Sequence, residues 1–287
     1  MRVIAILIFL IFSNNLKGQL SGSVYDKATG ESLSYVNIWY FNDEISVGTT
    51  ANESGSFKFD ELDTSRFLNF NKVGYEVLKV KPDSSKYDVF LTPIKKTRLN
   101  LSEEVEGPRR VKKGIDFENL TSMGSLSTTE SKPSIHVQYF PADNFLLYKL
   151  VRINLGLKNR VRSLINIRIY EATEHKIPGD LLYLEDLIKK ISAGKEVYRI
   201  SLKDLGIRIP ENGIFIGYEK LIIDQNKIML NETDYNTNQE VIISEYYPIF
   251  NLYESKDSNI IYSYVNGNWG KWKNSKISLG INLELKR

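Results

Sequence analysis

Short runs of alternating apolar and polar residues, separated by turn-forming residues, fill the chain from residue 20 to residue 91. Alternation with a period of two is typical of β-strands with one buried face, and here it places Phe57 and Phe59 together on one side. Asp26 and Gly30 in one break, and residues 52–55 in another, suit tight turns. About seven short strands in about seventy residues predict a small β-sandwich.

The same stretch resembles the carboxypeptidase-like regulatory domain family, a transthyretin-like β-sandwich common in envelope proteins of Gram-negative bacteria. The matching residues are Gly22, Val24, Asp26, Thr29, Gly30, Glu31, Leu33, Val36, Asn37, Ile38, Gly48, Thr49, Gly55, Phe57, Phe59, Val73, Gly74 and Tyr75. They cover about a quarter of the chain in a specific order and spacing. The resemblance implies a folding and docking module at residues 19–92 and does not imply peptidase activity.

Alternation returns at residue 134 and persists to the end of the chain. Residues 164–171 set Ile165, Ile167 and Ile169 on one face, and residues 214–219 behave similarly, so both are expected to be central strands. Further strands are predicted at 135–140, 148–154, 195–201, 227–230, 259–265 and 277–285. The Asn266-Gly267 pair predicts a hairpin. About eight or more strands in some 150 residues favour a larger, jelly-roll-like β-sandwich over residues 134–287.

One segment of this second half has two interpretations. Apolar residues recur at intervals of three and four between Leu181 and Ile191, which is helical spacing, so helix and strand both stay open there. The patterns at 168–171, 178–182 and 213–219 also resemble a domain that follows the regulatory module in some uncharacterised envelope proteins. That resemblance implies no catalytic residues.

The segments before and after the first module differ in composition from the two predicted sandwiches. Residues 1–18 combine a basic start, an apolar run of about ten residues and a polar end, which is typical of a secretory signal peptide and too short for a membrane span. A buried strand is the alternative. Residues 93–133 hold clustered charges of both signs and then many Ser and Thr, so we expect a flexible connector there.

Composition narrows the possible partners. The chain of 287 residues has 38 Lys and Arg against 35 Asp and Glu, a net charge of +3, which gives no support to nucleic-acid binding. No cysteine is present, which excludes disulfides, thiolate metal sites and cysteine nucleophiles. A cysteine-free secreted chain favours a bacterial envelope location that is secreted or periplasmic, with association with the outer membrane as an alternative. No transmembrane segment is expected after processing.

Reactive motifs are missing from the sequence. A zinc peptidase needs converging imidazoles and a carboxylate, yet the two histidines, His136 and His175, begin neither H-x-x-E nor H-E-x-x-H, so no metal or cofactor is predicted. Ser125 lacks the second glycine of a nucleophile elbow, and no phosphate-binding glycine motif occurs. A pair of carboxylates acting on a glycosidic bond stays open, because distance between side chains cannot be read from sequence.

Aromatic residues offer the candidate binding site. Trp269 and Trp272 follow the hairpin turn, and Tyr246 and Tyr247 precede a proline; exposed rings of this kind can stack on sugars or on apolar protein surfaces. Residues three apart on a strand point to opposite faces, however, so the two tryptophans cannot form one platform without a bulge, and core packing is the stronger interpretation.

The sequence therefore predicts a two-domain all-β protein that binds an envelope protein or a glycan and has no catalytic role. The alternative is a carbohydrate-active or peptide-active enzyme that uses carboxylates in the second domain. A fragment of an outer-membrane receptor is disfavoured by the length of the chain.

Overall fold

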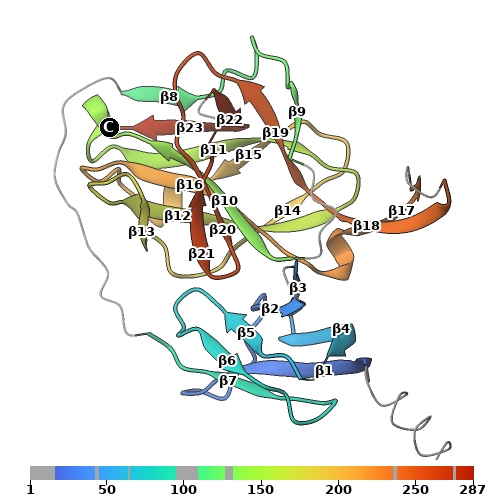
Figure 1. The fold of residues 1–287 in the computed structure, drawn as a ribbon. Helices are drawn as coiled ribbons and strands as arrows, with labels where there is room; N and C mark the ends of the chain where they lie inside the picture. The colour runs from blue at the N-terminus through green and yellow to red at the C-terminus, as the bar shows by residue number, and fades with distance from the viewer. Residues whose placement is uncertain are drawn as a thin grey trace, which may run out of the picture. The chain divides into compact units, whose positions relative to one another are not determined.

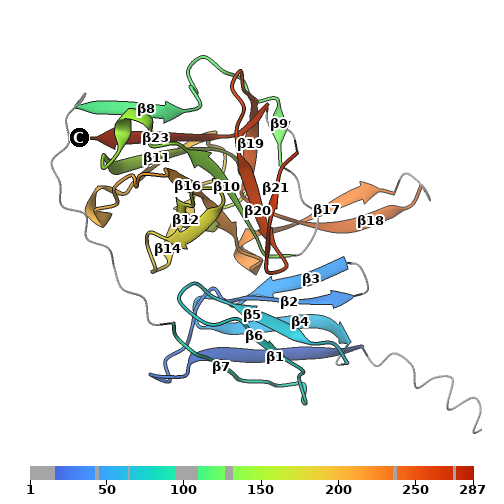
Figure 2. The same cartoon turned by 60° about the vertical axis from the view of Figure 1, so that its left-hand side comes forward.

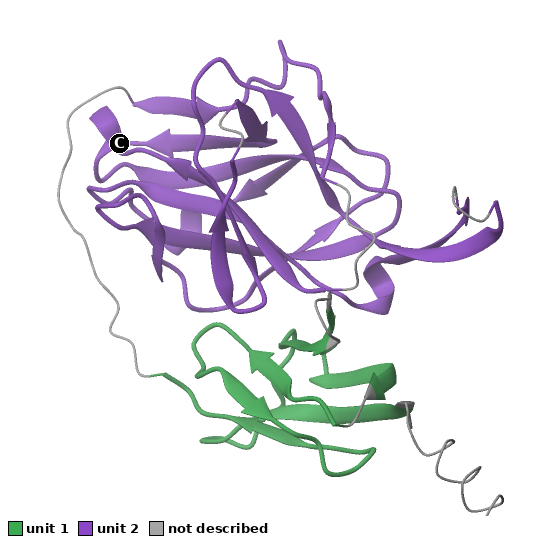
Figure 3. Ribbon diagram, viewed as in Figure 1, with its two compact units in different colours: residues 1–95 green, residues 96–287 purple. Residues whose placement is uncertain are grey.

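A computed structural model describes residues 17–42, 45–63, 65–94, 109–126, 132–234, 238–273 and 276–287. The chain divides into two compact units, residues 1–95 and 96–287, which are shown in different colours in Figure 3. The regular secondary structure of the described residues is strand apart from three short 3-10 helices, so the protein is all-β as predicted. The predicted leader, residues 1–18, falls outside the described residues except for Lys17 and Gly18, which begin the first strand.

Unit 1 consists of two sheets that enclose one apolar core (Figure 1). Its strands are β1 (Lys17–Asp26), β2 (Asn37–Asn42), β3 (Ile45–Thr50), β4 (Ser56–Asp63), β5 (Leu68–Asn71), β6 (Leu78–Val80) and β7 (Val89–Leu91). The sheets have the orders β4-β1-β7 and β3-β2-β5-β6. Phe57 and Phe59 are both buried in the core between them, which confirms the shared face that alternation predicts.

The predicted turns of unit 1 form through local side-chain hydrogen bonds. The carboxylate of Asp26 accepts from the backbone N–H groups of Ala28, at 2.6 Å, and Thr29, at 3.2 Å. Its second oxygen accepts from the Tyr75 hydroxyl at 2.7 Å, and these hydrogen bonds lower the pKa of Asp26. Gly30 closes the turn with a φ of +76°, a conformation that L side chains rarely adopt.

Unit 2 contains two seven-stranded sheets and a separate two-stranded ribbon (Figures 1 and 2). The first half supplies β8 (Arg110–Gly114), β9 (Gly124–Ser125), β10 (Ser134–Phe140), β11 (Lys149–Lys158), β12 (Ser163–Ala172), β13 (Pro178–Leu181), β14 (Leu187–Ile191), β15 (Val197–Ser201) and β16 (Ile214–Lys220). The second half supplies β17 (Lys227–Thr233), β18 (Glu240–Tyr246), β19 (Ile249–Glu254), β20 (Ile261–Val265), β21 (Asn268–Lys271), β22 (Ile277–Leu279) and β23 (Ile281–Lys286).

The two large sheets of unit 2 share one apolar core. The first has the order β13-β12-β16-β10-β20-β21, with β14 also paired to β12; the second has the order β22-β19-β11-β23-β8, with β15 on β11 and β9 on β19. Alternate residues of β12 and β16 meet those of β11 and β23 in this core, among them Ile167, Ile216, Leu155 and Leu283. The arrangement is sandwich-like, and the finer jelly-roll likeness stays a prediction. β20 and β21 pair across the Asn266-Gly267 turn, as predicted.

Two segments of unit 2 differ from the sequence prediction. Residues 93–133 were expected to be a flexible connector, but β8 and β9 lie within them and pair with β23 and β19, respectively. Local sequence carries no sign of these strands because their partners are more than a hundred residues away. Residues 181–191, whose spacing also permits a helix, contain none: they comprise the end of β13, a loop and β14. Leu187 and Ile191 point to the same side of β14 and enter the core, since a spacing of four suits a strand as well as a helix.

Candidate functional site

The candidate site lies on the face of the first large sheet that is turned away from the main core of unit 2. Along β12, Ile165, Ile167 and Ile169 enter the main core, so the alternate residues, Asn166 and Arg168 among them, project from the opposite face. That face carries a second apolar cluster formed by residues of β10, β12, β16 and β20. Charged and aromatic side chains thus share one side of a sheet whose other side is held by the core.

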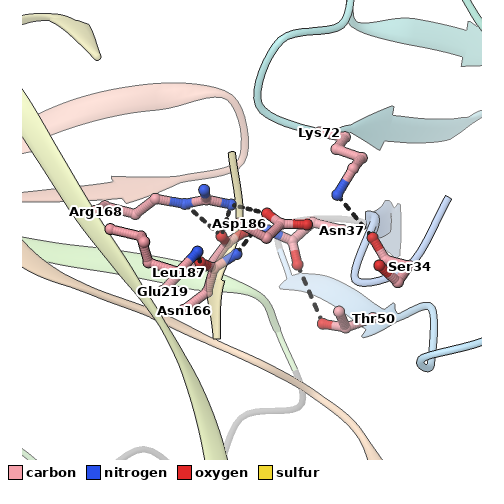
Figure 4. Close-up of polar contacts among 9 residues, drawn as sticks. All are labelled: Ser34, Asn37, Thr50, Lys72, Asn166, Arg168, Asp186, Leu187 and Glu219. Atoms are coloured by element: carbon pink, nitrogen blue, oxygen red, sulfur yellow. Dashed lines mark hydrogen bonds and ion pairs between the residues drawn. The ribbon is translucent and has the colours of Figure 1, made fainter. Parts of the chain in front are cut away.

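Arg168 is the centre of the polar part of this face (Figure 4). Its Nε donates to Oε2 of Glu219 on the neighbouring strand β16 at 2.7 Å, and its Nη2 donates to the same oxygen. Nη2 also lies 3.3 Å from Oδ1 of Asp186, which belongs to the loop between β13 and β14. Burial opposes the charge of the guanidinium, but the charges of Glu219 and Asp186 raise the pKa of Arg168 above its ordinary value.

Asn166 fixes the loop that carries Asp186. Its Nδ2 donates to Oδ1 of Asp186 at 2.8 Å, while its Oδ1 accepts from the backbone N–H of Leu187 at 2.9 Å. Both carboxylates of this cluster therefore accept hydrogen bonds from Arg168, and Asn166 and the β13–β14 loop hold one of them in place. We refer to Asn166, Arg168, Asp186 and Glu219 as the Arg168 cluster. Within the described part of the chain, Nη1 of Arg168 is a buried donor that has no hydrogen-bond acceptor.

An aromatic cluster adjoins the Arg168 cluster on the same face. Tyr170 follows Arg168 by two residues on β12, and its ring lies 5.2 Å from that of Trp269, with an interplanar angle of 88°. Tyr264 and Tyr262 on β20 hold the same indole, at 5.1 Å and 6.4 Å between ring centroids. Burial raises the pKa of Tyr170, so this hydroxyl stays protonated. Edge-to-face packing on Tyr170 and Tyr262, together with a tilted contact with Tyr264, fixes the orientation of the half-buried Trp269 side chain.

The structure does not bring the four aromatic residues of the predicted binding site together. Trp269 belongs to the aromatic cluster, whereas Trp272 packs against the main core and donates from Nε1 to the Ser263 hydroxyl at 2.7 Å. Tyr246 and Tyr247 are buried at the end of β18, where the Tyr247 hydroxyl donates to Glu245. The tryptophans thus belong to different clusters, which agrees with the expectation from their spacing.

The two histidines are also separated by their environments. His136 is buried on β10, with Nδ1 2.7 Å from the Ser263 hydroxyl and Nε2 3.2 Å from the Ser134 hydroxyl. Burial, together with the nearby positive charge of Lys220, lowers the pKa of His136 to about 3, so the imidazole is neutral at ordinary pH. His175 is exposed beside Glu174. The described residues contain no group of three or more His, Cys, Asp or Glu side chains placed to hold a metal ion.

Sequence reasoning did not select the members of the Arg168 cluster. The available signal was the alternation itself: Asn166 and Arg168 occupy the positions between three isoleucines in a strand that the pattern predicts to be central. Polar residues at such positions face either solvent or a polar partner on the next strand. Only the register of β12 against β16, with Asn166 opposite Glu219 and Arg168 opposite Gly217, identifies that partner.

Comparisons with known proteins identify no family. No protein-family model and no curated protein matches the chain. Among solved structures, a Bacteroides uniformis protein described as a candidate carbohydrate binding protein has 10% identity and a TM-score of 0.24, covering 81% of this chain and 97% of that one. The full-length major pilin SpaD of Corynebacterium diphtheriae has 10% identity and a TM-score of 0.21, covering 93% and 81%. Neither likeness is close enough to carry an argument about fold or function.

None of the helical segments in the described ranges has the length and apolarity needed to cross a bilayer.

Proposed function

We propose that this chain is a non-catalytic binding protein of the bacterial cell envelope, and that the face holding the Arg168 cluster and the aromatic cluster of unit 2 binds a neutral glycan. The observation that carries the proposal is the half-buried indole of Trp269, which is held in a fixed orientation on the same face as the Arg168 cluster. A fixed aromatic ring beside a polar cluster suits a ligand that has both hydroxyl groups and apolar faces.

The charge of the Arg168 cluster limits the ligand class. One guanidinium faces the two carboxylates of Asp186 and Glu219, so the cluster is negative as a whole and disfavours an anionic ligand. The Asp186 carboxylate, whose side chain is 18% exposed, can still accept a hydrogen bond from an uncharged hydroxyl group, which a sugar supplies. Both carboxylates serve here as acceptors that position Arg168, and this role supports binding over a reaction that would need one of them as a free acid.

Unit 1 fits this proposal as a carboxypeptidase-like regulatory domain that acts as a docking module. Its seven strands form two sheets around one core, and Asp26 and Gly30, two of the residues that carry the resemblance, build its first turn. We place the protein in the envelope on the basis of this resemblance and the leader expected at residues 1–18. In this arrangement unit 1 binds an envelope protein, and unit 2 binds the glycan.

The proposal is tested by isothermal titration calorimetry of the purified chain with neutral oligosaccharides chosen from a glycan array. Trp269→Ala should weaken binding at least about fivefold, because stacking on an aromatic ring contributes roughly 1–3 kcal/mol. Trp272→Phe is the matched control, since Trp272 packs on the main core, and it should leave affinity unchanged. Absence of binding to every neutral glycan, or equal affinity for the Trp269→Ala variant, would refute the proposed function.

A further inference from the structure

Among the described residues of unit 2, the β17–β18 ribbon pairs with neither of the two large sheets. It forms a two-stranded sheet of its own and projects from the body of the unit, as Figures 1 and 2 both show. Large apolar side chains on it are exposed: Met229 by 56%, Val241 by 36% and Ile242 by 68%. An isolated two-stranded ribbon is marginally stable in water, and exposed strand edges invite another strand.

The ribbon is also acidic. Glu232, Asp234 and Glu240 lie toward its tip, and the sequence contains no basic residue between Lys227 and Lys256. A partner strand for this ribbon should therefore be basic and should offer an open edge.

Unit 2 itself contains such an edge at β8. This strand is the last in the order of its sheet and pairs only with β23, so its other edge is open among the described residues. Residues 109–113 contain four basic side chains and no acidic one. Lys113 pairs with Asp143 at 3.0 Å, whereas Arg110 and Lys112 are exposed and form no ion pair with any described residue.

The spacing of charges on the two edges matches. Arg110 and Lys112 are two residues apart and project from one face of β8, and Glu232 and Asp234 have the same interval on the ribbon. An antiparallel pairing of β8 with β17 that sets Lys112 opposite Glu232 also sets Arg110 opposite Asp234. In that register Val111, which packs against the main core, lies on the same face as Met229 and Ile242.

The two edges of one copy cannot satisfy each other. In both views of the fold, β8 and the ribbon lie on opposite sides of unit 2. We propose that the β17–β18 ribbon of one copy pairs with the β8 edge of a second copy, which joins copies of this chain head to tail. Because the two surfaces differ, the contact does not close on itself in a pair, and repeated contacts extend into a filament or close into a ring.

The test is a charge swap followed by sedimentation velocity of the purified chain. The natural chain should associate as its concentration rises, and the association should weaken between 0.05 and 0.5 M NaCl, at about the concentrations where salt begins to screen exposed pairs strongly. The ribbon variant Glu232→Lys/Asp234→Lys and the edge variant Arg110→Glu/Lys112→Glu should each associate at least about tenfold more weakly. An equimolar mixture of the two should associate again, because each acid then meets a base.

The control is Glu211→Lys, which reverses an exposed acid on the turn before β16 and should associate like the natural chain. Circular dichroism establishes that each variant is folded; if a double variant unfolds, the single changes Lys112→Glu and Glu232→Lys repeat the mixing test. A natural chain that stays monomeric at every concentration would overturn the proposal. A mixture of folded variants that does not associate would also overturn the proposal. That result is expected if the charged residues serve only to keep the two strand edges from pairing with other strands and do not attract a partner.

Discussion

Protonation of His136 should couple the stability of unit 2 to pH. The imidazole is buried between the hydroxyl groups of Ser134 and Ser263, near the indole of Trp272, and Lys220 is the charged group that faces it. Burial and this positive charge lower the pKa of His136 from 6.5 to about 3 in the folded protein. The folded protein therefore keeps His136 neutral in mildly acidic solution, whereas the unfolded chain protonates it.

The sign and size of the effect follow from proton linkage. Between pH 6.5 and pH 3 the unfolded chain binds one more proton at this residue than the folded chain does, so stability falls as pH falls through that window. Each pH unit within it costs about 1.4 kcal/mol. From pH 6.5 to pH 4, His136 alone should remove about 3 kcal/mol from the free energy of unfolding.

Urea unfolding from pH 7 to pH 4, followed by tryptophan fluorescence, measures this loss. His136→Gln keeps hydrogen-bonding atoms near the two serines but cannot take up a proton, so its unfolding free energy should fall by about 3 kcal/mol less than that of the natural chain. His175→Gln is the matched control, because it removes an exposed imidazole, and it should follow the natural chain. Carboxylates contribute alike to all three proteins. If the natural chain and the His136→Gln variant lose stability in parallel, the assignment of a buried, neutral imidazole is wrong.

Two further predictions concern the sheet that carries the candidate site, both read from urea unfolding at neutral pH. Gly217→Ala should lower the free energy of unfolding by about 3 kcal/mol, because a Cβ there would lie 1.7 Å from the carbonyl oxygen of His136. In the control, Gly270→Ala, no atom lies nearer to the added Cβ than 3.9 Å, so stability should change by less than about 0.5 kcal/mol. Equal effects of the two changes would contradict the close approach of β10 and β16. Arg168→Met should lower the free energy of unfolding by about 3–5 kcal/mol, because it leaves the buried carboxylate of Glu219 without its charged partner. The double change Arg168→Met/Glu219→Leu should recover much of that loss. A double variant no more stable than Arg168→Met would refute the pairing.

The sequence predicts correctly those strands whose buried face is evident from the pattern of their own residues. In β12, three isoleucines at alternate positions show that one face is buried, whatever strand lies alongside. The Asn266-Gly267 hairpin and the Asp26 turn are also local, because they depend on backbone conformations and hydrogen bonds within a few residues. These features were predicted without knowledge of any partner.

β8, β9 and the candidate site depend on partners that are distant in the sequence. β8 is a strand because β23 lies beside it. Its residues alternate in exposure, but too few of them are apolar for the sequence pattern to predict a strand. Likewise, Glu219 reaches Arg168 only because β12 and β16 pair in one particular register, with Asp186 delivered by a loop. Trp269 and Trp272 illustrate both kinds of information. Their spacing predicts that they lie on different faces, but the side chains that surround each of them come from other strands.

The sequence by itself determined that this chain would form strands, where many of them would turn, and which of their faces would be buried. Only the tertiary structure decided which strands are neighbours, and with them the charge cluster around Arg168 and the two open strand edges. The physical reason is that alternation is a property of one strand, whereas pairing, register and charge compensation are properties of two.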